Sequence, residues 1–246
     1  GTDVSREVSD VVLLDDNFSS IVEGIKQGRK TYDNIKKFTK YFLAVNFSEI
    51  FLILLALVLG ARFGTDKWIL PLLPLQLLWM NLVTDSLPAL SLIFEKEDSV
   101  MELKPKKEKS ILDGIWRFVI VAGFLAFITE TIVYFVGINF GFSAEKIRTL
   151  VLTTAIMFEL FFVYTCRSKN LLLKTGIFSN KWLNYSIIIS LTLHLILVYS
   201  PLSSVFGVIS LSLNDWLLIL PIAISGLIIF ETGKYIKLKD KMNNAD

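Results

Sequence analysis

Six long apolar segments divide this sequence, and each is close to the roughly 20 residues that a helix needs to cross the hydrocarbon core of a bilayer. They lie at 38–59, 72–94, 115–137, 147–166, 182–200 and 213–236. Hydrophobic residues make up 53% of the chain and charged residues 20%, with the charges gathered between the apolar segments. One cysteine and a net charge of +2 exclude a disulfide scaffold and a strongly basic nucleic-acid binder. The sequence predicts an all-α polytopic membrane bundle of six transmembrane helices, rather than a soluble helical bundle.

Basic residues are distributed unequally between the two sides of this predicted bundle. The connections 95–114 and 167–181 and both ends of the chain are rich in Lys and Arg. Of the 25 basic residues, the other three connections and their flanks hold Arg62, Lys67, Lys146 and Arg148. Because Lys and Arg are retained on the cytoplasmic side of membranes, both termini are predicted to be cytoplasmic. The plasma membrane is expected rather than an organelle.

The first 40 residues are mainly polar and have a different pattern. The run Val11-Val12-Leu13-Leu14 predicts a short buried strand, which the turn residues Asp15-Asp16-Asn17 close. No proline occurs from Ser20 to Leu59, so one helix is expected to run from a cytoplasmic stalk into the membrane, capped by Asn17 or Ser19. A strand before such a stalk indicates a cytoplasmic domain whose remainder lies outside this sequence.

Three carboxylic acids fall at mid-depth of the predicted spans, namely Glu49, Asp85 and Glu159. Ionisable groups are costly at this depth and normally face a bundle interior or a water-filled path. Polar neighbours accompany them on the same helices: Asn46, Asn81 and Thr84. Asn46 and Glu49 are three residues apart and therefore share one helix face.

A proline interrupts the second span three residues after Asp85. Pro88 has no N–H and its ring clashes with the carbonyl of Thr84, so the sequence predicts that this carbonyl is freed. Carboxylate, amide and carbonyl oxygens together form the environment that hard cations such as Ca²⁺ prefer. Each amide or hydroxyl alone is better explained as an interhelical hydrogen bond, but three acids at matching depth favour a cation site.

Two further ionisable residues within the spans are predicted to lie outside this site. Glu130 lies toward the outer end of the third span and is interpreted as a snorkelling or paired acid. His194 is interpreted as a hydrogen-bonded packing residue rather than a proton relay. The sequence offers no catalytic and no cofactor-binding residue.

These motifs resemble the type II P-type ATPases, and among them the calcium pumps of the sarcoplasmic-reticulum type. The resemblance is carried by Gly1-Thr2-Asp3-Val4, Asp15-Asp16-Asn17-Phe18, Asn46 with Glu49, and the stretch PLQLLWMNLVTDSLPA at 74–89. It extends from residue 1 to the end of the sixth span and is strongest over 1–110. Glu130 departs from the pattern of the family.

The resemblance implies that the chain is the C-terminal membrane half of such a pump, carrying spans five to ten, and Gly1 in place of Met is expected of a piece of a longer protein. Residues 1–19 would end the phosphorylation domain and 20–37 would form the stalk. Residues 38–236 would form the transport domain and 237–246 a cytoplasmic tail.

The resemblance also implies the cation ligands. One site would take Asn46, Glu49, Thr84, Asp85 and Glu159, and a second would take Asn81 and Asp85 with the missing fourth span. The transported ion would be Ca²⁺, with possible H⁺ counter-transport. The partners would be the lipid bilayer and the missing N-terminal half, which has four spans and the actuator, nucleotide and phosphorylation domains; no nucleic-acid partner is expected.

ATP and Mg²⁺ would act through the missing domains alone. Because the Asp-Lys-Thr-Gly-Thr phosphorylation motif is absent, this chain by itself would not form the phosphoenzyme, and its status as an enzyme stays open. Alternatives are a P-type pump for Na⁺, K⁺, H⁺ or Mg²⁺ and a stand-alone six-span secondary transporter. The latter would show repeats with paired broken helices, whereas one broken span is visible.

Overall fold

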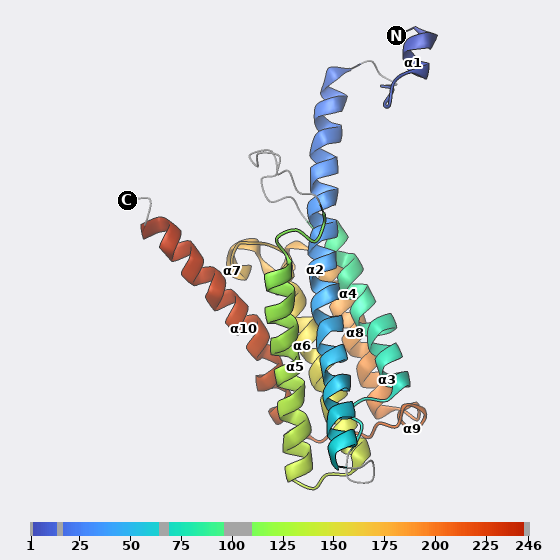
Figure 1. Cartoon of the computed structure of the whole chain (residues 1–246), viewed down its shortest axis with the longest axis vertical. Coiled ribbons are helices and arrows are strands. Elements are labelled where there is room, and N and C mark those ends of the chain that lie inside the picture. The colour runs from blue at the N-terminus through green and yellow to red at the C-terminus, as the bar shows by residue number, and fades with distance from the viewer. Residues whose placement is uncertain (1, 14–16, 64–68, 96–109, 244–246) are drawn as a thin grey trace.

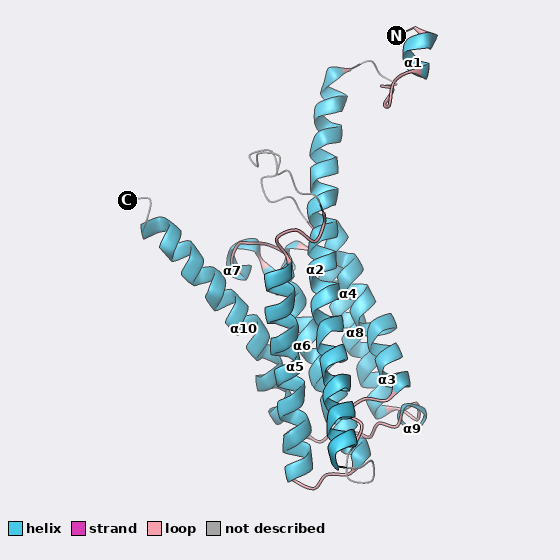
Figure 2. Ribbon diagram, viewed as in Figure 1, coloured by secondary structure: helices cyan, strands magenta, loops and turns pink. Residues whose placement is uncertain are grey.

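The computed structural model describes residues 2–13, 17–63, 69–95 and 110–243. Helices joined by loops account for these residues, and no strand occurs among them (Figure 2). Five of the six spans are single long helices, and the second span is a composite of shorter ones. Their bounds are α2 (Phe18–Phe63), α5 (Trp116–Asn139), α6 (Ala144–Cys166), α8 (Lys181–Tyr199) and α10 (Leu213–Asn243).

The composite span consists of four short helical pieces in series: α3 (Pro74–Trp79), η2 (Met80–Asp85), α4 (Ser86–Ser91) and η3 (Leu92–Phe94). The remaining short helices are α1 (Asp3–Glu7), α7 (Leu172–Thr175), η5 (Ile177–Ser179) and α9 (Ser203–Phe206). Six helical segments of the described chain are long and apolar enough to cross a membrane. They coincide with the six predicted spans, and the prediction of an integral, multi-pass all-α bundle is confirmed.

Helix α6 lies at the centre of the bundle, with α2, α5, α8 and α10 around it (Figure 1). Its most apolar stretch is 89% buried inside the protein, whereas the corresponding stretches of the other spans are 22–44% buried. A transmembrane helix whose side chains face protein on all sides can carry polar groups that lipid would not tolerate. This explains how α6 accommodates Glu159 and several threonines.

Helix α2 runs without interruption for 46 residues, so the prediction that one continuous helix leads into the first span is confirmed. The backbone N–H of Ser19 donates to Asn17 Oδ1 over 3.0 Å, which identifies Asn17 as the capping side chain. The N-terminal part of α2 extends beyond the bundle, at the end where α10 also protrudes (Figure 1).

The predicted strand at 11–14 is wrong for the residues that can be compared. Residues 11–13 have no strand structure, while 14–16 lie outside the described residues. Val11 is 77% exposed and Val12 43% exposed. A strand requires a neighbouring strand to satisfy its backbone groups, and the described part of this chain supplies no such partner.

The second span is altered by a π-helical turn, η2, rather than by an unwound segment. Such a turn accommodates an extra residue, and Ser86 Oγ donates to the carbonyl of Asn81 over 2.6 Å. The carbonyl of Thr84, which Pro88 was expected to leave free, lies 3.3 Å from Ser190 Oγ of α8. Pro88 has no N–H to donate to this carbonyl, and the hydroxyl of Ser190 on a neighbouring helix takes the place of the missing helical donor.

Candidate cation site

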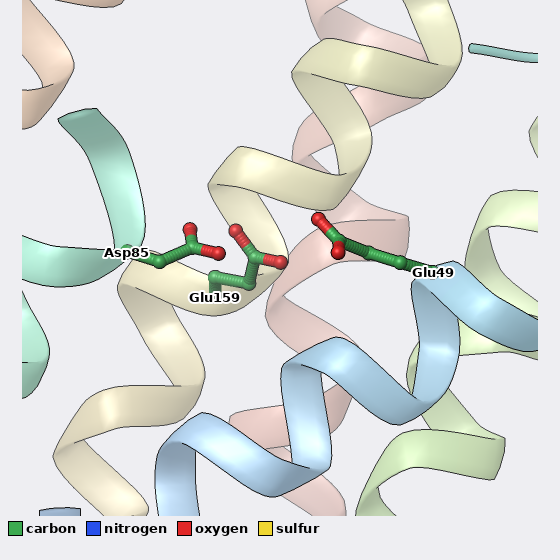
Figure 3. A group of neighbouring side chains, drawn as sticks. All are labelled: Glu49, Asp85 and Glu159. Atoms are coloured by element: carbon green, nitrogen blue, oxygen red, sulfur yellow. The ribbon is translucent and has the colours of Figure 1, made fainter. Parts of the chain in front are cut away.

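Three carboxyl groups from three different elements meet inside the bundle. One oxygen each from Glu49 of α2, Asp85 of η2 and Glu159 of α6 lie within 4.8 Å of one another. All three residues are buried, with exposed fractions of 6%, 0% and 2%. Figure 3 shows Glu159 between the other two, with the three carboxyl groups pointing toward a common region. The three acids that the sequence singled out thus lie together.

Several oxygens of this carboxyl cluster have no donor in the protein. Asp85 Oδ2 and both oxygens of Glu159 are buried without a hydrogen-bond partner. Buried carboxylates so close together repel one another, and the protein places no cationic side chain in ion-pair contact with them within the described residues. Either protons or a bound cation must therefore neutralise the cluster.

Asn81 and Thr84 lie beside the cluster, and both donate hydrogen bonds to its carboxyl oxygens. Asn81 Nδ2 donates to both oxygens of Glu49, over 3.0 and 2.9 Å. Thr84 Oγ1 lies 3.1 Å from the carbonyl of Met80 and 3.3 Å from Asp85 Oδ1. The π-helical turn thus presents an acid, an amide and a hydroxyl within five residues, and π-helical turns are frequent at functional sites.

Asn46 is placed differently from the other predicted ligands. Its Nδ2 donates to the carbonyl of Phe42, one turn earlier in α2, over 2.8 Å. The side chain is half-buried, and this hydrogen bond stays within its own helix. The structure brings Asn81 and Thr84 into hydrogen-bond contact with the acids but does not do so for Asn46.

Glu130 of α5 does not snorkel, as its position in the span had suggested, because it is 1% exposed. Its Oε1 lies 3.3 Å from Ser48 Oγ, and its Oε2 is buried without a partner. Glu130 thus faces α2, against which α5 packs. Glu130 is outside the group of three acids that lie within 4.8 Å of one another.

His194 of α8 is fully buried, and its Nε2 lies 3.0 Å from Thr153 Oγ1 of α6. This contact joins two helices and agrees with the interpretation of His194 as a packing residue.

Sequence reasoning missed a second buried polar cluster, centred on Arg167 and Glu95. Both residues were counted as part of basic cytoplasmic connections, where a solvated side chain is the usual expectation. Their side chains are instead buried and paired, with Arg167 Nε 2.9 Å from Glu95 Oε2. The one feature of the sequence that could have indicated this cluster is the position of Glu95, an acid directly at the end of an apolar span.

Comparison with known proteins adds two findings. The family described as "Cation transporting ATPase, C-terminus" matches residues 69–236, which is more than half of the chain. Among curated proteins, a calcium-transporting ATPase 1 of Bacillus cereus is 36% identical over 96% of this chain. A calcium-transporting ATPase of Bacillus subtilis is 36% identical over 89% of the chain.

Similarity extends beyond bacteria. An endoplasmic-reticulum-type calcium-transporting ATPase 3 of Arabidopsis thaliana is 34% identical over 96% of the chain. These relatives are much longer, since the chain spans 28%, 24% and 26% of their lengths respectively.

Proposed function

This chain belongs to the cation-transporting ATPase family and matches the C-terminal part of its members. We therefore propose that it forms the membrane half of an ATP-driven calcium pump. The observation that carries the proposal is the cluster of Glu49, Asp85 and Glu159, whose carboxyl groups converge while Asp85 Oδ2 and both oxygens of Glu159 are buried without a hydrogen-bond partner. A divalent cation placed among them would remove the repulsion that the empty cluster suffers. The names of the relatives, all calcium-transporting ATPases, favour Ca²⁺ as that cation.

The donor set supports a hard cation. Ca²⁺ takes about six to eight oxygen ligands, from carboxylates, amides, hydroxyls, carbonyls and water. Glu49, Asp85 and Glu159 supply carboxylates, Thr84 supplies a hydroxyl and Asn81 an amide. A soft metal would call for sulfur or imidazole ligands, and no Cys or His is part of the cluster.

Ion binding would require Asn81 to turn its side chain. Its nitrogen now donates to both oxygens of Glu49, and turning the amide away would free Glu49 for the first ion and leave Oδ1 available as a ligand of the second. Asn46 would have to give up its bond to Phe42 in the same way. With these two changes the predicted ligands Asn46, Glu49, Thr84, Asp85 and Glu159 would form one site. Asn81 and Asp85 would contribute to a second.

The remaining parts of the pump are assigned on the same basis. Residues 1–19 would close the phosphorylation domain, 20–37 would be the stalk, and 237–246 would be a tail. The N-terminal half of the pump would supply four more spans and the domains that use ATP and Mg²⁺. We place both ends of this chain in the cytoplasm, and the pump in the plasma membrane.

Transport would follow from movement of the stalk. Closure of the actuator, nucleotide and phosphorylation domains would displace α2, and with it Glu49, and so change the access and affinity of the site. Carboxylates that have released Ca²⁺ would take up protons, because three buried negative charges cannot stay together uncompensated. This proton uptake would give counter-transport.

The direct test is ATP-dependent ⁴⁵Ca²⁺ uptake by the full-length pump in proteoliposomes. The variant Glu159→Gln is compared with Glu145→Gln, the same substitution at an exposed position of the same helix. We expect uptake by the wild type and by Glu145→Gln and none by Glu159→Gln. Uptake that does not need ATP would contradict a pump, and ATPase activity stimulated by Na⁺, K⁺ or H⁺ instead of Ca²⁺ would contradict the choice of ion.

A further inference from the structure

A buried polar cluster lies where the second span ends, on the stalk side of the cation site. At its centre is the ion pair of Arg167, which caps the C-terminus of α6, and Glu95, which follows η3. Arg167 Nε donates to Glu95 Oε2 over 2.9 Å and its Nη2 donates to Oε1 over 3.0 Å. The side chains are 1% and 3% exposed. The pair is therefore bidentate and shielded from water.

All five N–H groups of Arg167 have acceptors. Besides the two bonds to Glu95, Nη1 donates to the carbonyls of Gly176 (3.1 Å) and Ile177 (3.2 Å), and Nη2 donates to Ser179 Oγ. A guanidinium offers five donors in a fixed planar arrangement, and here each is used. The orientation of Arg167 is consequently fixed relative to η5 and to Glu95.

The same acid also contacts α8. Asn180 Nδ2 donates to Glu95 Oε2 over 2.8 Å and to the carbonyl of Ser91 over 3.1 Å. Asn180 Oδ1 accepts from the N–H of Leu183 over 3.1 Å and so caps α8. One side chain thus joins the end of the second span to the start of α8.

The stalk helix is joined to this cluster by an amide. Asn34 of α2 is 2% exposed, and its Nδ2 donates to the carbonyls of Ile93 (2.8 Å) and Glu95 (3.2 Å). Its Oδ1 accepts from Lys37 Nζ over 3.2 Å, and Lys37 pairs with Asp33 over 2.9 Å. Asn34 therefore holds two backbone carbonyls of the second span directly.

The elements joined here are those that carry the carboxyl cluster. Asn34 precedes Glu49 by 15 residues of one continuous helix, about 22 Å at about 1.5 Å per residue. Glu95 ends the span that contains Asp85, and Arg167 follows Glu159 by eight residues, about 12 Å along α6. A displacement of the stalk would therefore reach all three acids through one rigid connection.

We propose that Asn34, Glu95 and Arg167 form a coupling clamp, which passes displacement of the stalk helix α2 to the helices that carry Asp85 and Glu159. The inference rests on the proposed function, since it assigns positioning residues to the same transport cycle. These residues do not touch the ion. Their role is to make the three ligand-bearing helices move together, because a buried, fully bonded pair has one arrangement rather than many.

A clamp needed only for stability would not require charge. Replacing a buried ion pair by apolar residues of similar size is often neutral or stabilising, whereas removing one partner leaves an unpaired buried charge. The double variant Arg167→Met/Glu95→Met therefore removes the clamp without creating such a charge. Asn34→Leu is the second variant: it removes the connection to the stalk and leaves the ion pair intact. Gln27→Leu is its control, because the Gln27 amide bonds to Glu23 within α2.

The test compares two quantities in the full-length pump: equilibrium ⁴⁵Ca²⁺ binding, and the number of Ca²⁺ ions transported per ATP hydrolysed. For Asn34→Leu and for the double variant we expect Ca²⁺ affinity close to that of the wild type. The transport ratio should fall about fivefold or more, as for the loss of ordinary coupling between two sites. Gln27→Leu should change neither quantity.

The outcomes separate the clamp from the proposed function. An unchanged transport ratio in Asn34→Leu would overturn the clamp while leaving the calcium pump intact. Loss of Ca²⁺ binding in parallel with transport would also overturn it, since the residues would then only support the site. A wild-type protein that transports no Ca²⁺ would instead overturn the proposed function, and the clamp with it.

Discussion

Ser190 Oγ of α8 lies 3.3 Å from the carbonyl oxygen of Thr84, the backbone group that Pro88 deprives of its helical donor. The hydroxyl also lies 3.5 Å from the carbonyl of Val83. A serine on a neighbouring helix thus satisfies the backbone of the π-helical turn immediately before Asp85. The turn can persist inside a membrane because this donor is present.

Removing that donor should weaken the cation site. In Ser190→Ala the Thr84 carbonyl loses its partner, at a cost of about 1 kcal/mol, which corresponds to about fivefold in affinity. We expect equilibrium ⁴⁵Ca²⁺ binding to weaken by up to about this factor. The control is Ser186→Ala on the same helix, because Ser186 bonds to the carbonyl of Leu183 within α8. Equal affinities in the two variants would show that Ser190 does not support the turn.

Gly226 of α10 faces the ring of Phe158, the residue before Glu159. A Cβ atom at Gly226 would lie 2.7 Å from Phe158 Cζ, which is closer than real Cβ contacts. Gly226→Ala should therefore displace α6, destabilise the protein by about 1–3 kcal/mol and weaken Ca²⁺ binding. Thermal unfolding and ⁴⁵Ca²⁺ binding measure the two effects.

Gly233→Ala provides the matched control on the same helix, because nothing lies within 4 Å of a Cβ atom built there. It should leave Ca²⁺ affinity unchanged and keep or raise the unfolding temperature, since Ala favours helix more than Gly does. If Gly226→Ala behaves like Gly233→Ala, close packing of α10 on α6 does not position Glu159.

Glu130→Gln tests whether the fourth buried acid belongs to the cation site. Gln has the same shape and keeps an oxygen that can accept from Ser48, while it removes a carboxyl group whose Oε2 lacks a donor. We expect Ca²⁺ affinity near that of the wild type and an unfolding temperature that is equal or higher. Loss of Ca²⁺ binding as complete as in Glu49→Gln would contradict the placement of Glu130 outside the ligands.

Much of this fold could be predicted from the sequence because its signals are long. Six apolar segments and the proline-free run into the first span identify the spans and the continuous helix α2. The acids at mid-depth could be predicted to meet, because exposing them to lipid is costly and they must therefore face the interior of the bundle. A short apolar run such as Val11 to Leu14, in contrast, matches a strand only if a partner strand exists.

Contacts between helices could not be predicted in the same way. The π-helical turn and its donor Ser190 depend on how α8 packs against the second span, which periodicity does not specify. The pairing of Arg167 with Glu95 joins residues 72 positions apart. In the sequence, both Arg167 and Glu95 have the position of an ordinary charged residue at a membrane boundary, and only the packing of the helices pairs them. Burial of Glu130 likewise follows from the packing of α5 on α2.

The central claim is that carboxyl groups from α2, η2 and α6 bind one calcium ion together. Equilibrium ⁴⁵Ca²⁺ binding to the full-length pump in detergent tests it, with Glu49→Gln and Asp85→Asn as the variants and Glu23→Gln, at an exposed position of the α2 stalk, as the control. We predict micromolar binding by the wild type and the control, and loss of binding in both site variants. Binding that survives either substitution, or a wild type that binds no Ca²⁺, would contradict the account.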